Sequence, residues 1–163
     1  MDRIWAPWRM EYVGGGADRK DGKCFLCVGE GDDERSLVVG RQGSAFVIMN
    51  RYPYTNGHVM VVPVRHVGSI EHLPDEEALD MIRLVKIMSA IFKEDFEAHG
   101  VNIGINSGRA AGAGLEDHFH IHMVPRWFGD TNFMTVEGEV RVISEHITES
   151  YRRLKRRFVE KVL

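Results

Sequence analysis

Hydrophobic and polar positions along the chain follow two different spacings. Short runs of apolar and β-branched residues, separated by turn residues such as Gly43, Pro53 and Gly57, are typical of successive antiparallel strands. A similar run comes before the polar loop that starts at Gly108. These runs predict strands over residues 36–40, 45–50, 58–64 and 101–107.

The other spacing, with an apolar residue every three or four positions, predicts a long helix in the middle of the chain. Pro74 and the three acidic residues after it are typical of a helix start, because proline fits the first turn and acids favour the positive end of the helix dipole. We expect this helix to end at His99 and Gly100. Its apolar stripe predicts core packing and consists of Ala78, Met81, Val85, Met88 and Phe92.

A second helix is predicted at the end of the chain, with Ser144 as its N-cap. Its apolar face consists of Ile147, Tyr151, Leu154, Phe158 and Val162. We interpret the opposite, basic side as a solvated face rather than a nucleic-acid contact, and it consists of Arg152, Arg153, Arg156 and Arg157. An antiparallel sheet of about five strands, with one long inserted helix and one C-terminal helix, is an α+β fold.

Length and composition limit the number of domains. With 163 residues, of which 44% are hydrophobic, the chain can bury one core but lacks the length for two domains. We expect an N-terminal arm and glycine-rich connection at residues 1–23, followed by a single domain at 24–163. The arm contains Trp5 and Trp8, which we interpret as packing on the protein's own surface or on a second copy rather than stacking on substrate.

The overall charge excludes a broad class of partner. A net charge of -3 and a pI of about 6.2 indicate no global basic field, which argues against a protein whose main role is to coat nucleic acid. Phosphate recognition must then be local. The sequence contains no apolar run of signal-peptide or membrane-span length, so we expect no membrane partner and a cytoplasmic location.

The strongest chemical signal is the stretch His-Phe-His-Ile-His at residues 118–122. Alternate side chains of a β-strand share a face, so three imidazoles are predicted on one face, with Phe119, Ile121 and Met123 on the other. A single histidine is more often structural than functional. A row of three is costly to bury and suits nucleophilic, acid-base or metal chemistry, because the charge of imidazole changes near neutral pH.

The only two cysteines, Cys24 and Cys27, are separated by two residues. In a reducing compartment this spacing is more often a metal half-site or a redox pair than a structural disulfide. Two cysteines offer half of a tetrahedral zinc site, which needs four protein ligands when it is structural. The alternative is a reduced, packed cysteine pair. The remaining histidines without a partner pattern are interpreted as surface residues, namely His72, His99 and His146.

A glycine-rich loop at residues 107–114 lies directly before the histidine motif. Because glycine has no Cβ, such a loop can bring backbone N–H groups close to phosphate oxygens. The alternative is an ordinary mobile turn. Arg109 supplies a local cation of the right type, and we therefore predict a phosphate cradle here.

Two stretches together resemble the histidine triad family. One runs from Asn50 to His66 and reads Asn-Arg-Tyr-Pro-Tyr-Thr-Asn-Gly-His-Val-Met-Val-Val-Pro-Val-Arg-His, and the other runs from His118 to Pro125. The resemblance covers nearly the whole chain after the arm. Three further stretches, at 5–9, 108–114 and 125–133, resemble the bacterial branch of the family that is related to diadenosine tetraphosphate phosphorylases.

The resemblance implies a covalent mechanism. The middle histidine, His120, is the expected nucleophile on an α-phosphate, because a neutral imidazole can form a nucleotidyl-histidine and so split one difficult displacement into two easier ones. His122 and His58 are expected as supporting catalytic histidines near the phosphates and the leaving group. The expected substrate-binding residues, besides His120 and His122, are Asn50, Asn106, Ser107, Gly108, Arg109 and Gly114.

The resemblance to zinc-containing members and to galactose-phosphate uridylyltransferase also implies the two missing metal ligands. These are His66 and His118, and the first histidine of the triad would then face the metal rather than the reaction. The expected structural zinc site therefore consists of Cys24, Cys27, His66 and His118.

The chain departs from the family at one position that affects the reaction. Better-known hydrolases of the group have a glutamine a few residues before the first histidine, whereas this chain reads Leu115-Glu116-Asp117. The amide that would hold the leaving group or position water is missing, and Ser107 is a candidate for part of that contact. We therefore expect phosphorolysis of diadenosine tetraphosphate to ADP and ATP, with inorganic phosphate as co-substrate.

Other functions stay open at the level of sequence. Within the enzymes, the alternative is a hydrolase of dinucleoside polyphosphates or of nucleoside phosphoramidates. Outside them, the alternative is a nucleotide-binding module that has lost turnover, although binding alone does not require a nucleophile. The resemblance also implies a homo-oligomer, at least a dimer.

Overall fold

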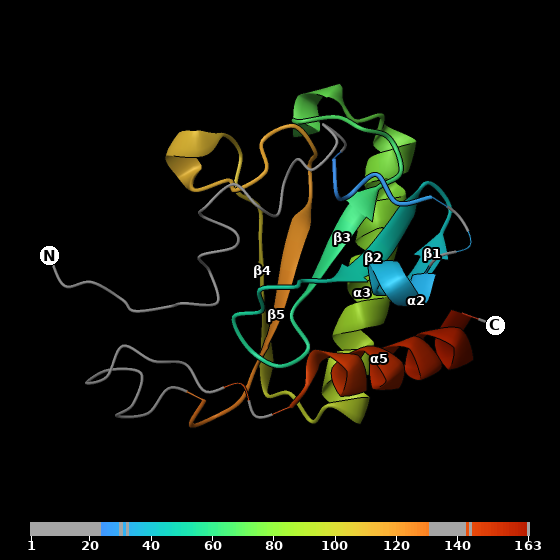
Figure 1. The fold of residues 1–163 in the computed structure, drawn as a ribbon, viewed down its shortest axis with the longest axis vertical. Helices are drawn as coiled ribbons and strands as arrows, with labels where there is room; N and C mark the ends of the chain where they lie inside the picture. Colours follow the sequence, from blue (N-terminus) through green and yellow to red (C-terminus); the bar gives the residue numbers. More distant parts are fainter. Residues whose placement is uncertain (1–23, 30, 32, 131–142, 144, 163) are drawn as a thin grey trace, which may run out of the picture.

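The computed structural model describes residues 24–29, 31, 33–130, 143 and 145–162. One antiparallel sheet has the strand order β1-β2-β3-β5-β4 (Figure 1). Its strands are β1 (Val38–Gln42), β2 (Ala45–Met49), β3 (Val59–Pro63), β4 (Gly100–Gly104) and β5 (Ile121–Arg126). The helical segments are α2 (Asp33–Ser36), η2 (Ile70–His72), α3 (Asp75–Asp95), η3 (Arg109–Ala111) and α5 (Ile147–Val162). The predicted α+β fold is confirmed.

Two sequence predictions fall on residues that the structure does not describe, namely the arm with Trp5 and Trp8 and the N-cap Ser144. The single domain at 24–163 stays a prediction. Among the residues that the structure describes, no helix is both long and apolar enough to cross a bilayer. The cytoplasmic location also stays a prediction.

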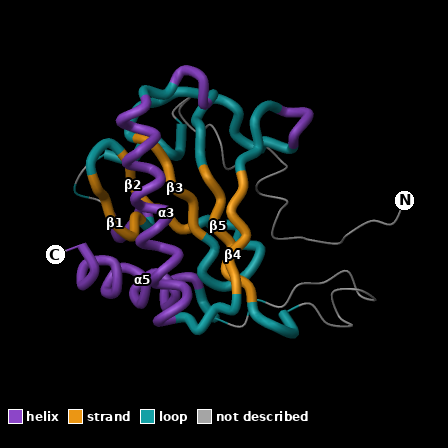
Figure 2. The backbone as a smooth tube through the Cα atoms, turned by 180° about the vertical axis from the view of Figure 1, so that it is seen from behind, coloured by secondary structure: helices purple, strands orange, loops and turns teal. Residues whose placement is uncertain are grey.

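The two long helices lie on one side of the sheet (Figure 2). As predicted, α3 begins with Asp75, Glu76 and Glu77, and its Met81, Met88 and Phe92 are buried. The alternate strand residues that face these helices form the main core, and they include Ala45, Val47, Val59, Val61, Ile121 and Met123.

The opposite face of the sheet has a second, smaller core. Its strand residues are Val38, Phe46, Ile48, Met60 and Val62. Leu26, from the segment just before α2, is fully buried against them. Within the part of the chain that the structure describes, no long helix covers this face beside the small core.

A glycine lets α5 approach β1 closely. A Cβ at Gly40 would lie 2.1 Å from the ring of Phe158, so any larger residue would push the helix away from the sheet. The basic side of α5 is docked as well. Arg153 lies over the Phe96 ring at 4.1 Å, and Arg157 pairs with Asp95 at 2.7 Å. The predicted solvated face is therefore correct for the exposed Arg152 and Arg156, and wrong for Arg153 and Arg157, which are half-buried against the end of α3.

Several predicted boundaries are wrong by a few residues. β1 begins at Val38 rather than Ser36, because Ser36 belongs to the short helix α2 and Leu37 has a left-handed φ of 61°. α3 ends at Asp95 rather than at His99, because Glu97 has a φ of 50° and the N–H of Ala98 turns back to the Phe92 carbonyl at 2.9 Å.

The strands around the glycine-rich loop are also shorter than predicted. β4 ends at Gly104, so Ser107 lies in the loop, and β5 begins at Ile121 rather than at His118. The segment before β5 instead bonds a loop, because the N–H of Phe119 donates to the Val67 carbonyl at 2.6 Å. The alternation of side chains still starts early, since Phe119, Ile121 and Met123 all enter the main core as predicted.

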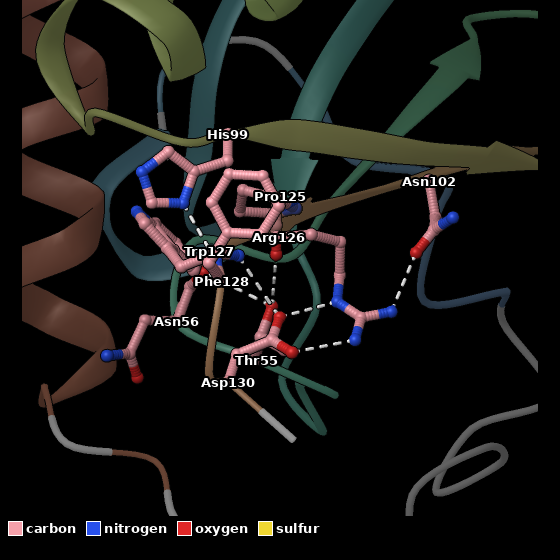
Figure 3. A network of polar contacts seen from close by, with 9 residues as sticks. All are labelled: Thr55, Asn56, His99, Asn102, Pro125, Arg126, Trp127, Phe128 and Asp130. Atoms are coloured by element: carbon pink, nitrogen blue, oxygen red, sulfur yellow. Dashed lines mark hydrogen bonds and ion pairs between the residues drawn. The ribbon is translucent and has the colours of Figure 1, made fainter. Parts of the chain in front are cut away.

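A network of polar contacts lies where the start of β4 is paired with the end of β5 (Figure 3). Arg126 pairs with Asp130 at 2.6 Å and donates to the Asn102 side chain at 2.9 Å. The N–H of Phe128 donates to Nδ1 of His99 at 2.8 Å, and the two rings stack at 4.5 Å. His99 is exposed, as predicted, but it braces this turn and leaves Phe128 with 88% of its surface accessible.

Candidate active site

A cavity of about 390 Å³ lies on the sheet face that the long helices leave open. Its apolar lining consists of Phe25, Val28, Ile48, Met49, Met60 and Leu115. Its polar lining includes Asn50, Tyr54, Asn106, Gly114, His120 and His122. Five of the predicted substrate-binding residues therefore surround one cavity, namely Asn50, Asn106, Gly114, His120 and His122.

Strand pairing orders this lining across the sheet. Ile48 on β2 is paired with Met60 on β3, and Met60 is paired with His122 on β5. Paired residues point to the same face. The cavity floor therefore changes from apolar over β2 and β3 to histidine over β5, which suits a ligand with an apolar part and an anionic part.

His120 is held in one tautomer by the backbone. Its Nδ1 lies 2.8 Å from the carbonyl oxygen of His118, which can only accept a hydrogen bond. Nδ1 therefore carries the proton, and Nε2 keeps a lone pair. Burial lowers the pKa of His120, so the neutral ring is favoured, although the bond to His118 opposes this shift.

A chain of hydrogen bonds fixes the tautomers of the two other site histidines. The backbone N–H of Tyr54 donates to Nδ1 of His58 at 3.1 Å, so the proton of neutral His58 must be on Nε2. His58 Nε2 lies 3.1 Å from Nδ1 of His122, which therefore accepts. Nε2 of His122 then carries the proton and is a hydrogen-bond donor.

Burial keeps both of these rings neutral. His58 is fully buried, and burial together with the neighbouring His122 and His120 lowers its pKa to about 3. Burial and His120 lower the pKa of His122 to about 4. Tyr54 stacks on His58 with ring centroids 4.7 Å apart. Because His58 lies behind His122, it is suited to positioning His122 rather than touching a substrate.

Asn50 is oriented by its own turn. Its Oδ1 accepts the backbone N–H of Tyr52 at 2.9 Å, which fixes the amide. Its NH₂ group lies beside the His58 ring without donating to it, because the Nε2 atom 3.4 Å away carries the proton directed at His122. The amide thus lies at the mouth of the histidine cluster and lines the cavity.

The glycine-rich loop is only partly at the cavity. Asn106 Nδ2 donates to the Gly112 carbonyl at 3.4 Å, and Gly112 has a φ of 87°, which a side chain rarely adopts. Ser107, Gly108 and Arg109 are exposed and are not among the described cavity-lining residues. Arg109 pairs instead with Glu116 at 2.8 Å. Their predicted contact with substrate stays a prediction.

The four predicted metal ligands come together beside the cavity. The ligand atoms of Cys24, Cys27, His66 and His118 all lie within 4.8 Å of one another. Cys27 Sγ lies 3.2 Å from His66 Nδ1 and 3.7 Å from His118 Nδ1, and Cys24 Sγ lies 3.4 Å from His118 Nδ1. Sulfur and nitrogen ligands of tetrahedral zinc lie about 3.6 Å apart, because Zn–S bonds are about 2.3 Å and Zn–N bonds about 2.0 Å.

The surroundings of this cluster also fit a metal. His118 Nε2 donates to the Pro63 carbonyl at 2.9 Å, which leaves the Nδ1 lone pair for the ligand position, as is usual for metal-binding histidines. Burial lowers the pKa of His118 and so favours the neutral ring that binds metal. Partial burial and the adjacent Cys24 raise the pKa of the Cys27 thiol, a cost that a divalent cation between the two sulfurs would offset.

Three residues of the site were not predicted from the sequence. Phe25 and Val28 line the cavity from the segment that carries the cysteines, and Tyr54 lines it beside His58. The position of Phe25 between two predicted metal ligands was the available signal, but its neighbours in space could not be inferred from spacing. Nothing in the sequence indicated the hydrogen bonds that fix the tautomers of His58 and His122, because the first of them is donated by a backbone N–H.

Comparisons with known proteins agree with this geometry. The chain is 35% identical over 161 residues to the AP-4-A phosphorylase of Mycobacterium tuberculosis, which covers 94% of this chain and 83% of that protein. It is 35% identical over 82 residues to the bis(5'-adenosyl)-triphosphatase of Dictyostelium discoideum, covering 50% of this chain and 54% of that one.

A solved structure and a family model also match this chain. A zinc-bound histidine triad family protein from Mycobacterium smegmatis superposes with a TM-score of 0.63 at 28% identity, covering 77% of this chain and 85% of that one. The HIT domain model matches residues 32–129, which include all five strands and every histidine of the cavity. The chain therefore belongs to the HIT family.

Proposed function

We propose that this chain is an enzyme that transfers a nucleotidyl group from a dinucleoside polyphosphate through a covalent intermediate on His120. The observation that carries the proposal is the 2.8 Å hydrogen bond from His120 Nδ1 to the His118 carbonyl. It leaves Nε2 of a neutral, cavity-lining imidazole as a nucleophile, which a binding module would not need. The named activities of the two relatives support the same substrate class.

The reaction has two displacements at one phosphorus atom. Nε2 of His120 forms a P–N bond to the α-phosphorus while the P–O bond to the leaving polyphosphate breaks. With diadenosine tetraphosphate, the leaving group is ATP. An incoming oxygen then attacks the same phosphorus and breaks the P–N bond, which restores neutral His120. Phosphate as the acceptor gives ADP, whereas water gives AMP.

His122 is placed to assist as a donor. Its Nε2–H, fixed by the chain that runs from Tyr54 through His58, would donate to a phosphate oxygen as negative charge moves to the leaving group. A donor that needs no reorientation contributes most to such a transition state. His58 is proposed as a positioning residue that acts through His122.

Phosphate is the acceptor we propose. A relative that aligns over 94% of this chain is named a phosphorylase. In addition, Leu115 stands where the hydrolase pattern has glutamine, and it lines the cavity without offering an amide to water. The ion pair between Arg109 and Glu116 is exposed to solvent and so contributes little stability. Arg109 could therefore leave Glu116 and bind a phosphate at little cost in free energy. Ser107 and Gly108 belong to the same proposed phosphate cradle.

Hydrolysis is the second candidate, because the Dictyostelium relative is named a triphosphatase. Its match covers 50% of this chain, against 94% for the phosphorylase relative. The resulting AMP would distinguish it from phosphorolysis.

We propose structural zinc for the cluster of Cys24, Cys27, His66 and His118. The donor set and its spacing support this assignment, and a zinc-bound neighbour has the same fold. Bound zinc would cross-link the segment before α2 to the residues that follow β3 and precede β5, and so stabilise the fold.

We also propose that two copies pair. β4 is an edge strand of the described sheet, and its Ile103 has 50% of its surface exposed. An exposed apolar edge is a natural place for a second chain to add. Light scattering should give the mass of two chains, and Ile103→Lys should lower it to that of one.

The proposed reaction is tested by product analysis. Purified protein is incubated with diadenosine tetraphosphate, with and without inorganic phosphate, and the nucleotides are separated by chromatography. We expect ADP and ATP in a phosphate-dependent reaction. AMP and ATP at a rate indifferent to phosphate would identify a hydrolase, and the absence of turnover would support the binding module.

A further inference from the structure

The peptide group between His118 and Phe119 is hydrogen-bonded at both ends. Its carbonyl, from His118, accepts the Nδ1 proton of His120 at 2.8 Å. Its N–H, from Phe119, donates to the carbonyl of Val67 at 2.6 Å. Because a peptide group is planar and rigid, the bond at one end limits the direction of the group at the other end. The Val67 carbonyl therefore constrains the carbonyl that orients the proposed nucleophile.

We propose that Gly68 is a positioning residue for His120. The absence of a side chain at Gly68 lets the loop after β3 come close enough for the Val67 carbonyl to hold that peptide group. The inference rests on the proposed function, since it assumes that His120 is the nucleophile. Gly68 is not among the residues described as lining the cavity, so it would act through the backbone alone.

The contact at Gly68 is too close for any other residue. A Cβ there would lie 2.7 Å from the Glu116 carbonyl oxygen and 3.4 Å from Asp117 Cα, whereas Cβ atoms keep at least about 3.0 Å from other heavy atoms. Both neighbours are backbone atoms, so no side-chain rotation can relieve the collision. Gly68 does not have a positive φ, so space rather than backbone freedom requires glycine here.

The two segments that meet at Gly68 are both anchored close by. Val67 packs against the main core, and Phe119 is buried in it. In addition, His118 Nε2 donates to the Pro63 carbonyl at 2.9 Å, which ties the same two segments together a second time. Neither segment can therefore retreat as a whole to make room for a Cβ.

A Cβ at Gly68 would instead have a local effect. It would displace the exposed residues just before His118, or it would move the Val67 carbonyl away from its donor. Either movement turns the peptide group that orients His120. An imidazole without this partner can exchange its proton between the two nitrogens, and the form with Nε2–H has no lone pair there for attack on phosphorus.

Nucleotide binding should be affected much less than the chemical step. Ile48 and Met60 line the cavity from strands whose pairing does not involve Gly68. Among the cavity-lining residues, Leu115 directly precedes Glu116 and can shift with it. We therefore expect AMP affinity and KM to change by only a few-fold.

Gly68→Ala tests the proposal, with Gly100→Ala as the matched control. At Gly100 no atom of the described residues lies within 4 Å of an added Cβ, and its φ is not positive either. With diadenosine tetraphosphate, Gly68→Ala should lower kcat about 10- to 100-fold, because a displacement of about 1 Å near a reacting group can cost that much. Gly100→Ala should keep the parent's kcat. All proteins are compared at equal zinc content, since His66 lies two residues before Gly68.

Two NMR measurements distinguish positioning from a general loss of structure. The ¹⁵N shifts of the His120 ring report which nitrogen carries the proton, and hydrogen exchange of the Phe119 amide reports its bond to Val67. In the parent, Nδ1 should carry the proton, and the Phe119 amide should exchange slowly although it lies outside the strands. In Gly68→Ala, both tautomers should be populated, and the amide should exchange at least about tenfold faster.

A kcat of Gly68→Ala that stays within about tenfold of the parent's would overturn the inference. A lower kcat with the His120 tautomer unchanged would also overturn it, because glycine would then only preserve the fold. If Gly68→Ala does not fold, the parent decides, since rapid exchange of the Phe119 amide would overturn the inference and slow exchange would support it. A parent that does not turn over diadenosine tetraphosphate would contradict the proposed function instead, and the two NMR measurements would still test the positioning of His120.

Discussion

The backbone carbonyl of His118 accepts the Nδ1 proton of His120, while the ring of His118 faces Cys24 and Cys27. Two histidines of one short motif thereby take different roles. The first supplies a metal ligand and an orienting carbonyl, and the second presents Nε2 to the cavity.

His120→Ala should reduce turnover of diadenosine tetraphosphate by at least about 10³-fold, because it removes the covalent path. AMP affinity should change only a few-fold, since the rest of the cavity is intact. Steady-state kinetics and calorimetry measure the two effects. His72→Ala, which removes an exposed histidine on η2, is the matched control. Activity of His120→Ala within about tenfold of the parent would remove this residue from the mechanism.

His58→Phe should lower kcat by about 10- to 100-fold with little change in KM, because His122 loses the partner that fixes its tautomer. His58→Gln should recover part of the rate. Its amide oxygen can accept the Tyr54 N–H and its NH₂ group can donate to His122. Equal rates for the two variants would indicate that His58 only fills space.

Stability should fall as the pH is lowered below about 6.5. His58 and His122 have pKa values of about 3 and about 4 in the folded protein, whereas unfolded histidine titrates near 6.5. Between these values the unfolded chain binds more protons, so the free energy of unfolding decreases with falling pH. The slope is at most about 1.4 kcal/mol per pH unit for each histidine, and it vanishes above about pH 7.

Urea denaturation at about pH 7, 6 and 5 measures this dependence. His58→Gln should show a shallower slope than the parent at equal zinc content. His72→Ala should show the parent's slope. A parent-like slope in His58→Gln would mean that the buried histidine does not carry the effect.

The purified protein should contain about one zinc ion per chain. Cys24→Ser should lower zinc content and melting temperature together, because the energy of a structural metal site is part of the folding energy. Elemental analysis and thermal denaturation measure both. A stable and active protein without metal would show that the two cysteines are simply packed.

Local sequence patterns were enough to predict the fold class and several buried residues of the strands and of α3. Alternation placed Phe119, Ile121 and Met123 in the core, and the helical stripe identified Met81, Met88 and Phe92 as buried. These inferences succeed because side-chain direction follows from the local geometry of strands and helices. The element ends were less certain, since Leu37 and Glu97 adopt left-handed conformations that their residue types do not favour.

The composition of the site depended on long-range packing. His66 and His118 come together because β3 and β5 are neighbours in the sheet, and burial of Leu26 in the small core brings Cys24 and Cys27 beside them, although the residues concerned are up to 94 positions apart. Phe25 and Tyr54 enter the cavity for the same reason. The histidine motif could therefore be recognised in the sequence. The different roles of its histidines, as metal ligand, nucleophile and hydrogen-bond donor, depend on backbone carbonyl and N–H groups that only the folded chain brings within hydrogen-bonding distance.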